Sequence, residues 1–267
     1  MKLTISLAQI EVAKADPGKN LKKAETLVSE AARKGSDLVC FPEMWTTGFQ
    51  WDRNKAMAAD HEKVIARVAE LARQHRIWIN GSMLALDEKG RVSNTAILFD
   101  AQGGPAAVYR KTHLFTLLHE EEHMAPGQSL AMADTPWGRA GFSICYDIRF
   151  PELFRTYALK GAQFVMLPSA FPHPRLPHWQ VLTRARAIEN QMFMIGVNQV
   201  GGEDFGSEGK VRYFGHSCVI DPWGETVAEA GEDEALLTVS LEIDQVKEVR
   251  NKMRVLKDRR PELYELD

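Results

Sequence analysis

The sequence GFSICYDIRFPEL, residues 141–153, joins an apolar run to a cysteine, a polar segment and a proline. The apolar run predicts a buried strand that ends at Cys145, and Pro151 can open a helix a few residues later. A cysteine at such a corner can be exposed beside backbone N–H groups, which favour a thiolate or an oxyanion. We therefore interpret Cys145 as a candidate nucleophile. The alternative is a cysteine packed as a small hydrophobe, which is the commoner role of single cysteines.

Strands and helices alternate through most of the chain, which predicts an α/β fold. Short apolar runs indicate strands at residues 3–10, 37–41, 77–84, 94–99, 108–111, 163–167, 192–198, 216–220 and 236–241. Amphipathic spacing indicates helices at residues 21–31, with Asn20 as the N-cap, and at 60–75, 151–159 and 179–190. We expect segments 113–127 and 203–211 to be irregular loops. Composition does not shift anywhere, so we expect one domain over residues 1–267.

Composition and charge exclude several classes of protein. There are 33 basic and 36 acidic residues, for a net charge of −3, which gives no reason to expect nucleic acid or an anionic membrane as a partner. The 3 cysteines are odd in number and lack metal-site spacing, so we expect neither a disulfide framework nor a metal site. No run approaches the roughly 18 apolar residues of a membrane span, and the first ten residues are too polar for a signal peptide. We therefore expect a cytoplasmic protein.

Two more reactive side chains follow apolar strands, as Cys145 does. Glu43 comes just after the strand at 37–41, and Lys111 stands at the exit of the strand at 108–111. Sites form at the carboxyl ends of strands in α/β sheets. A neutral thiol needs a base, and Glu43 could take its proton and later return it to a leaving amine. The charge of Lys111 would stabilise a thiolate and an oxyanion, with the N–H of Tyr146 as a second oxyanion donor.

Each assignment has a plainer alternative. Glu43 could be a surface carboxylate, and Lys111 could belong to a solvated basic face, because charged residues are mostly exposed. None of the 8 histidines stands at a diagnostic spacing from Cys145, so the sequence leaves a histidine base open. Cys40 and Cys218 lie within apolar strands and are expected to be buried packing residues.

Three segments together resemble the signature blocks of the nitrilase superfamily of carbon–nitrogen hydrolases. The blocks are FPE at 41–43, YRKTHLF at 109–115 and CYDIRFPEL at 145–153, in the order found in the family. The resemblance implies a four-layer α-β-β-α sandwich that pairs through its helices as a homodimer. It also implies a triad without metal or organic cofactor, in which Glu43 is base and acid, Lys111 stabilises the oxyanion and Cys145 is the nucleophile.

Many members of this superfamily carry a further catalytic glutamate between the lysine and a Pro-Gly turn. Pro126-Gly127 resembles that turn, and Glu120 has the best separation on both sides. Glu121 and Glu122 stay open as alternatives, as does an acidic loop without a catalytic role.

The segment EMWTTGF at 43–49 resembles the omega-amidase branch, whose members hydrolyse the terminal amide of 2-oxoglutaramate and 2-oxosuccinamate. The resemblance implies a small-molecule amide substrate that carries a carboxylate, a cysteine thioester intermediate and release of ammonia. The cations available to that carboxylate are Arg149, Arg175 and Lys210, unless Arg149 forms a structural ion pair. The aromatic residues expected at the pocket, with core packing as the alternative, are Phe49, Tyr146, Phe171 and Trp179.

Other functions stay open at this stage. Within the same enzyme class, the chain could be a deaminated-glutathione amidase or an N-carbamoyl amidohydrolase. Outside it, the chain could be a catalytically silent scaffold of the same fold.

Overall fold

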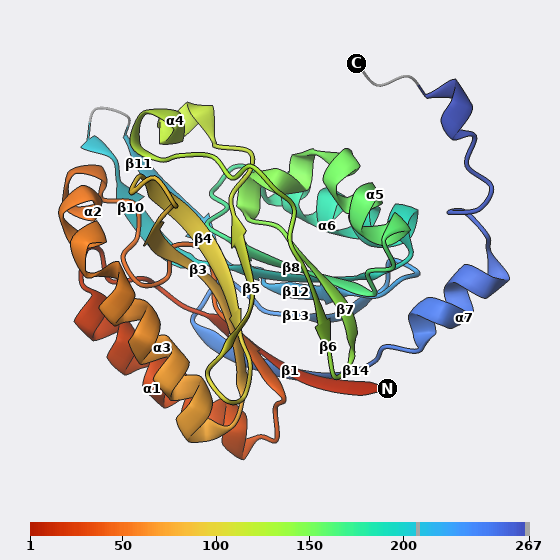
Figure 1. Ribbon diagram of the computed structural model, residues 1–267, viewed down its shortest axis with the longest axis horizontal. Coiled ribbons are helices and arrows are strands. Elements are labelled where there is room, and N and C mark those ends of the chain that lie inside the picture. Colours follow the sequence, from red (N-terminus) through yellow and green to blue (C-terminus); the bar gives the residue numbers. More distant parts are fainter. Residues whose placement is uncertain (207–208, 265–267) are drawn as a thin grey trace.

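Two six-stranded sheets form the middle of the molecule in the computed structural model, which describes residues 1–206 and 209–264 (Figure 1). The first sheet has the order β14-β1-β2-β3-β4-β5, and its strands are β1 (Lys2–Gln9), β2 (Leu38–Cys40), β3 (Trp78–Leu86), β4 (Val92–Phe99), β5 (Pro105–Arg110) and β14 (Ala235–Glu242). The second has the order β13-β12-β9-β8-β7-β6, and its strands are β6 (Met132–Thr135), β7 (Gly138–Phe142), β8 (Phe164–Ser169), β9 (Phe193–Asn198), β12 (Cys218–Ile220) and β13 (Thr226–Glu229). The parallel strands are β1, β2 and β3 in the first sheet and β7, β8 and β9 in the second. Every other strand of the two sheets pairs with its neighbour in antiparallel direction.

Helices cover the outer face of each sheet, which gives four layers (Figure 1). The first sheet is covered by α1 (Pro17–Arg33) and α3 (His61–His75), and the second by α5 (Pro151–Leu159) and α6 (Leu176–Asn190). The remaining helical elements are α2 (Trp51–Met57), η1 (Ala58–Asp60), η2 (Thr116–Leu118), α4 (Glu120–His123), η3 (Cys145–Arg149), α7 (Gln245–Lys252) and η5 (Pro261–Leu263). This arrangement is the predicted α-β-β-α sandwich. None of the helices in the described part of the chain combines the length and apolarity that a membrane span needs.

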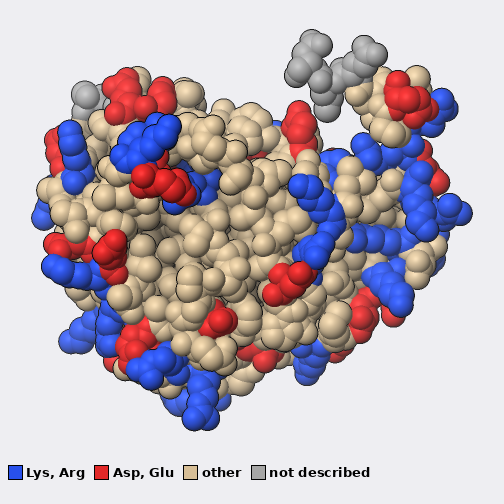
Figure 2. Space-filling model, viewed as in Figure 1, with Lys and Arg blue, Asp and Glu red and all other residues tan. Residues whose placement is uncertain are grey.

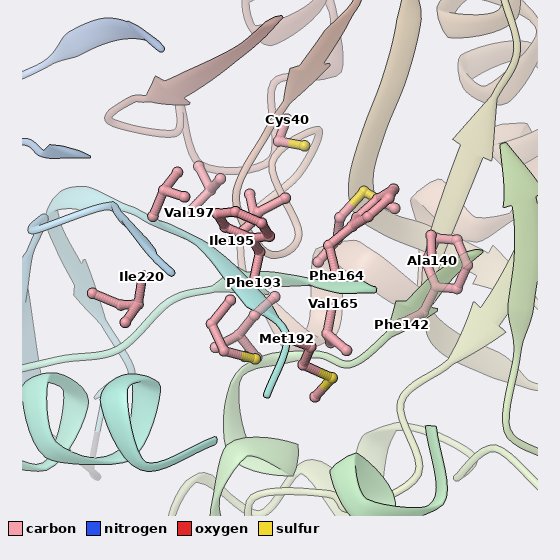
Figure 3. Close-up of a cluster of buried hydrophobic side chains, with 14 of the residues drawn as sticks. Cys40, Ala140, Phe142, Phe164, Val165, Met192, Phe193, Ile195, Val197 and Ile220 are labelled. Carbon is pink, nitrogen blue, oxygen red and sulfur yellow. The ribbon is translucent and has the colours of Figure 1, made fainter. Parts of the chain in front are cut away.

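Apolar side chains fill the space between the layers. One cluster joins the two sheets, and Figure 3 shows Phe164 and Ile195 of the second sheet in the same cluster as Cys40 of the first. Another cluster lies between the first sheet and its helices, where Val28 of α1 and Leu71 of α3 are buried. The surface carries both signs of charge, interspersed around a broad uncharged centre on the face in Figure 2.

The start of α1 differs from the prediction. Asp16, not Asn20, is the N-cap, and its Oδ1 accepts the backbone N–H of Lys19 at 2.9 Å. The helix starts earlier because Pro17, whose φ is already helical, occupies its first position. Asn20 is buried instead, and its side chain donates to the carbonyl oxygens of Ala13 and Thr46.

The segment predicted as a loop at 203–211 connects two strands of a hairpin, whose ends it includes. Strands β10 (Val200–Asp204) and β11 (Lys210–Phe214) pair in antiparallel register, and only residues 207–208 of the predicted loop lie outside the described residues. The glycines and charges of this segment hid the strands, because these residue types are uncommon in sheets. α2, β6, β13 and α7 were also not predicted, since they are short and rich in polar or small residues.

Candidate active site

Cys145 lies on a tight turn rather than at the end of a strand. β7 ends at Phe142, earlier than predicted, and Cys145 opens η3 with a left-handed backbone (φ 43°). Such a φ is uncommon for a residue other than glycine and recurs at functional sites. The buried Asp147 holds the turn, since its Oδ2 accepts the N–H of Ile144 and the hydroxyl of Tyr109, both at 2.8 Å. The turn leaves Cys145 half-buried, and α5 begins at Pro151 as predicted.

Glu43 is buried just beyond β2, and both of its carboxylate oxygens are engaged. Oε1 accepts Lys111 Nζ and Asn94 Nδ2, each at 2.8 Å. Oε2 accepts the N–H of Ala170, the residue after β8, at 2.9 Å. Gln199 holds the backbone, because its Nε2 donates to the Glu43 carbonyl oxygen at 2.7 Å. With 1% of its surface exposed, Glu43 is not the surface carboxylate of the alternative interpretation.

Lys111 bridges Glu43 and a second buried carboxylate. Its Nζ lies 2.8 Å from Glu43 Oε1 and 2.8 Å from Oε1 of Glu120, which opens α4. Glu120 also accepts the N–H of Phe115 at 2.9 Å. Among the three consecutive acids, Glu121 and Glu122 are exposed, so only Glu120 enters the cluster.

The charges of this cluster shift the titration of its members. Burial alone would lower the pKa of Lys111, but the carboxylates of Glu120 and Glu43 raise it overall. Burial and the nearby Glu43 raise the pKa of Glu120 despite its contact with Lys111. Burial, then the charge of Glu43, also raises the pKa of the Cys145 thiol well above its ordinary value, against the opposing charge of Lys111. The raised pKa favours a neutral thiol, which needs a base to take its proton before it can attack.

A narrow cleft of about 20 Å³ opens beside Cys145. This volume is room for about one water molecule. The cleft is lined by Phe115, Cys145, Tyr146, Arg149, Ala170, Phe171, Pro172 and Arg175. The sequence predicted Tyr146, Arg149 and Phe171 at the pocket, and all three line this cleft.

Two residues predicted at the pocket do not line this cleft. Phe49 packs in a separate buried cluster with Met44 and Tyr213. Trp179 lies behind the lining, where its ring packs on Phe171 at 5.6 Å between centroids and its Nε1 donates to the His216 carbonyl oxygen at 2.8 Å. Their apolar character predicted burial correctly, but it does not distinguish a cleft wall from the core behind it.

Two arginines at the cleft contact aromatic rings, and no carboxylate of residues 1–206 or 209–264 pairs with them. Arg149 lies over the rings of Tyr146 and Phe171, at 5.9 and 5.4 Å, and its Nη2 lies 3.2 Å from His178 Nδ1. Arg175 lies 5.6 Å from the ring of Phe115. Neither guanidinium forms an ion pair within the described part of the chain, so the structural ion pair considered for Arg149 is not found there.

Other candidates of the sequence lie elsewhere. Lys210 is exposed on β11, where it pairs with Asp204 at 3.3 Å. His113 bonds Asp147 at 2.8 Å and stacks on Phe150, so it serves the turn rather than the thiol. The sequence missed Asn94 and Ala170, because a neutral amide within a strand and a backbone N–H carry no catalytic signature.

Comparison with known proteins defines the class to which this site belongs. The chain belongs to the carbon-nitrogen hydrolase family, whose model matches residues 4–251. It is therefore a hydrolase of carbon–nitrogen bonds in linear amides, as the resemblance implied.

Particular relatives narrow the class to amidases. The chain is 35% identical over 265 residues to the 2-oxoglutaramate amidase of Bacillus subtilis, with 99% of this chain and 100% of that protein covered. It is 33% identical over 278 residues to the omega-amidase NIT2 of Danio rerio, with 100% and 98% covered. Among solved structures, the chain resembles a mutant amidase from Nesterenkonia sp. AN1, with a TM-score of 0.86 and 27% sequence identity. The match covers 98% of this chain and 95% of that one. That structure shows covalent addition of the acetamide moiety of fluoroacetamide at the active-site cysteine.

Proposed function

We propose that this chain is an omega-amidase that hydrolyses the terminal amide of a small keto acid such as 2-oxoglutaramate or 2-oxosuccinamate. One observation carries the proposal: the buried Glu43–Lys111–Glu120 cluster borders a half-buried cysteine whose cleft is also lined by two arginines, Arg149 and Arg175. The cluster suits attack on an amide, and the arginines suit a carboxylate at the other end of the substrate. The names of the Bacillus and Danio relatives agree with this substrate class.

Acylation begins with proton transfer from the Cys145 thiol to Glu43. The sulfur attacks the amide carbon, a C–S bond forms, and the carbonyl π electrons move to oxygen. Lys111 Nζ and the N–H of Tyr146 stabilise this oxyanion. When the intermediate collapses, the C–N bond breaks, Glu43 gives its proton to nitrogen, and ammonia leaves a thioester on Cys145.

Deacylation uses the same base. Glu43 takes a proton from water as the water oxygen attacks the thioester carbon. Collapse of the second tetrahedral intermediate breaks the C–S bond, and the sulfur recovers the proton from Glu43. The products are the carboxylic acid and the resting enzyme, in which the thiol is again neutral.

A panel of amides measured by ammonia release tests the substrate class. We expect 2-oxoglutaramate and 2-oxosuccinamate to have the highest kcat/KM. A higher kcat/KM for deaminated glutathione or for N-carbamoyl compounds would favour one of the two alternative activities. Cys145→Ala should abolish turnover, whereas Cys218→Ala, at a buried thiol in β12, should keep it. An intact-mass adduct on Cys145 with a slow substrate would identify the thioester. Undiminished activity of a folded Cys145→Ala variant would contradict the mechanism.

Substitution of the cleft arginines tests recognition of the carboxylate. Arg175→Gln should raise KM for 2-oxoglutaramate about 10- to 100-fold, the cost of about one charge-assisted hydrogen bond. It should leave kcat/KM for a neutral amide of the same length nearly unchanged. Lys210→Gln is the matched control, because Lys210 is exposed and lies outside the lining of the cleft. An equal loss on both substrates would show that Arg175 does not select a carboxylate.

We also propose that the chain forms a homodimer through the helices that cover the second sheet. Leu159 at the end of α5 and Val181 and Ile188 on α6 are exposed apolar residues, which a partner could cover. Val181→Asp should shift the mass measured by light scattering from dimer to monomer. A monomeric wild-type protein would contradict the proposal.

A further inference from the structure

Asn94 on β4 is a buried amide in the catalytic cluster to which the mechanism above gives no role. Its side chain is 1% exposed, and its Nδ2 donates to Glu43 Oε1 at 2.8 Å. An ionised carboxylate only accepts hydrogen bonds, so the amide atom that faces it must be the NH₂ group. The backbone carbonyl of Asn94 also accepts the N–H of Lys111 at 2.9 Å. One position on β4 therefore contacts both the base and the lysine.

The donors around Glu43 are divided between its two oxygens. Asn94 and Lys111 both bond Oε1, whereas the N–H of Ala170 bonds Oε2. Ala170 lines the cleft together with Cys145. Oε2 is thus bonded from the side of the cleft, whereas Oε1 is bonded by Lys111 and Asn94, which do not line the cleft.

The other half of the Asn94 amide, its Oδ1 atom, indicates that position 94 needs an amide for the Nδ2 donor. Its Oδ1 is buried and has no hydrogen-bond partner in the described part of the chain. A buried acceptor without a partner costs stability, and an apolar side chain would avoid that cost. Ala96 and Leu98, further along the same strand, are buried apolar residues. The unused oxygen is thus a cost that the bond to Glu43 offsets.

We propose that Asn94 is a positioning residue for amide hydrolysis: it holds Oε1 of Glu43 beside Lys111 and so turns Oε2 toward the Cys145 thiol. The inference rests on the proposed function, in which Glu43 is the base. Asn94 touches no reacting atom and acts through the orientation and charge of Glu43. The titratable groups that face Glu43 from the surrounding elements are Lys111, Glu120, Cys145 and Tyr213.

Asn94→Ala should lower kcat about 30-fold, which corresponds to about 2 kcal/mol at about 1.36 kcal/mol per tenfold and to about one hydrogen bond to a charged group. KM should stay within about twofold, because the arginines of the cleft are untouched. The acid limb of the kcat/KM profile should move to higher pH, since the carboxylate loses a donor that stabilises its charged form. A residue that served only packing would not move this limb.

Asn80 offers a matched control on the neighbouring strand β3. It is equally buried, also has an unpartnered Oδ1, and its Nδ2 donates to the Ile97 carbonyl oxygen at 3.4 Å rather than to Glu43. Asn80→Ala should keep the wild-type pH profile. If Asn94→Ala does not fold, Asn94→Leu has a similar size, carries no donor and should lose kcat to a similar extent.

Two outcomes would overturn the inference. One is a wild-type kcat and pH profile in folded Asn94→Ala or Asn94→Leu, and the other is the same pH shift in Asn80→Ala. These outcomes differ from failure of the proposed function, which would appear as activity in Cys145→Ala. An inactive Cys145→Ala beside a fully active Asn94→Ala would reject the positioning role alone.

Discussion

Glu203 on β10 is a buried carboxylate that ties the hairpin to the loop that follows Glu43. Its side chain is fully buried, and its Oε1 accepts the N–H of Phe49 at 2.9 Å and Nε2 of Gln50 at 3.2 Å. Its Oε2 accepts the hydroxyl of Tyr213 at 3.2 Å. The loop approaches closely at Gly48, whose φ is 67° and where an added Cβ would lie 3.1 Å from Glu203 Oε1. We predict that this carboxylate contributes several kcal/mol to the stability of the loop and hairpin.

The magnitude follows from the groups that Glu203→Ala would leave without partners. The N–H of Phe49 and the hydroxyl of Tyr213 would be buried and unsatisfied, at about 1–3 kcal/mol each. Lys14 Nζ lies 3.6 Å from Oε2 and is buried, so the substitution would also leave this ammonium without its carboxylate. The expected loss in the free energy of unfolding is about 3–5 kcal/mol.

Urea denaturation of the purified variants measures this loss. Asp204→Asn is the matched control, because Asp204 is the next residue on the same strand but is exposed and pairs with Lys210 on the surface. Its free energy of unfolding should change by less than about 0.5 kcal/mol. Glu203→Gln keeps the volume and one acceptor, and should fall between the two. A loss below about 1 kcal/mol in Glu203→Ala would refute the reasoning, because it would mean that water or new partners satisfy the orphaned donors.

Three further substitutions or reactions test the cluster and its turn. Lys111→Met leaves two buried carboxylates without their cation and should cost about 3–5 kcal/mol near neutral pH. A carboxyl with a raised folded-state pKa contributes stability below its unfolded pKa and loses it as pH rises, so the deficit should grow as pH rises above about 4.3, the ordinary pKa of glutamate. A pH-independent deficit in denaturation experiments would contradict this. Alkylation of Cys145 by iodoacetamide should accelerate about tenfold per pH unit near neutrality, since its raised pKa keeps the thiol neutral, whereas a rate that is flat with pH would indicate a resting thiolate. Asp147→Asn removes an acceptor from the turn and should cost about 2–3 kcal/mol in thermal unfolding, with an unchanged transition as the opposing result.

Much of the fold was predictable because its signals are local. The helix at 151–159 was predicted at its observed bounds, since a proline opens it and a glycine follows its end. The alternation of strands and helices indicated the α/β class, and the resembling blocks indicated the four layers. The hairpin at 200–214 was missed for the opposite reason: its stability comes from contacts such as those of Glu203, which its own sequence does not reveal.

The sequence predicted which reactive residues belong to the candidate site, but it did not predict how their hydrogen bonds are arranged. Glu43 and Lys111 were placed at strand exits, yet which carboxylate oxygen meets which donor depends on contacts between distant segments. Asn94 lies 51 residues from Glu43 in the chain, and Ala170 lies 127 residues from it. The upward shift of the Cys145 pKa could not be predicted either, because it depends on burial and on the closeness of Glu43.

Lys111 contacts two carboxylates, so one of them can carry the proton during catalysis while the other stays paired with the ammonium. With Glu43, Glu120 and Lys111 all ionised, the cluster carries one net negative charge, which opposes a second negative charge on sulfur. In the proposed mechanism, the proton that leaves Cys145 moves to Glu43, so negative charge shifts from the carboxylate to the sulfur and then to the oxyanion without an increase in total charge. Lys111 keeps Glu120 as its counter-ion while Glu43 is protonated. If Glu43 were the one carboxylate on Lys111, each proton transfer would leave the buried ammonium without a carboxylate, so that only the charge on sulfur or on the oxyanion would oppose it.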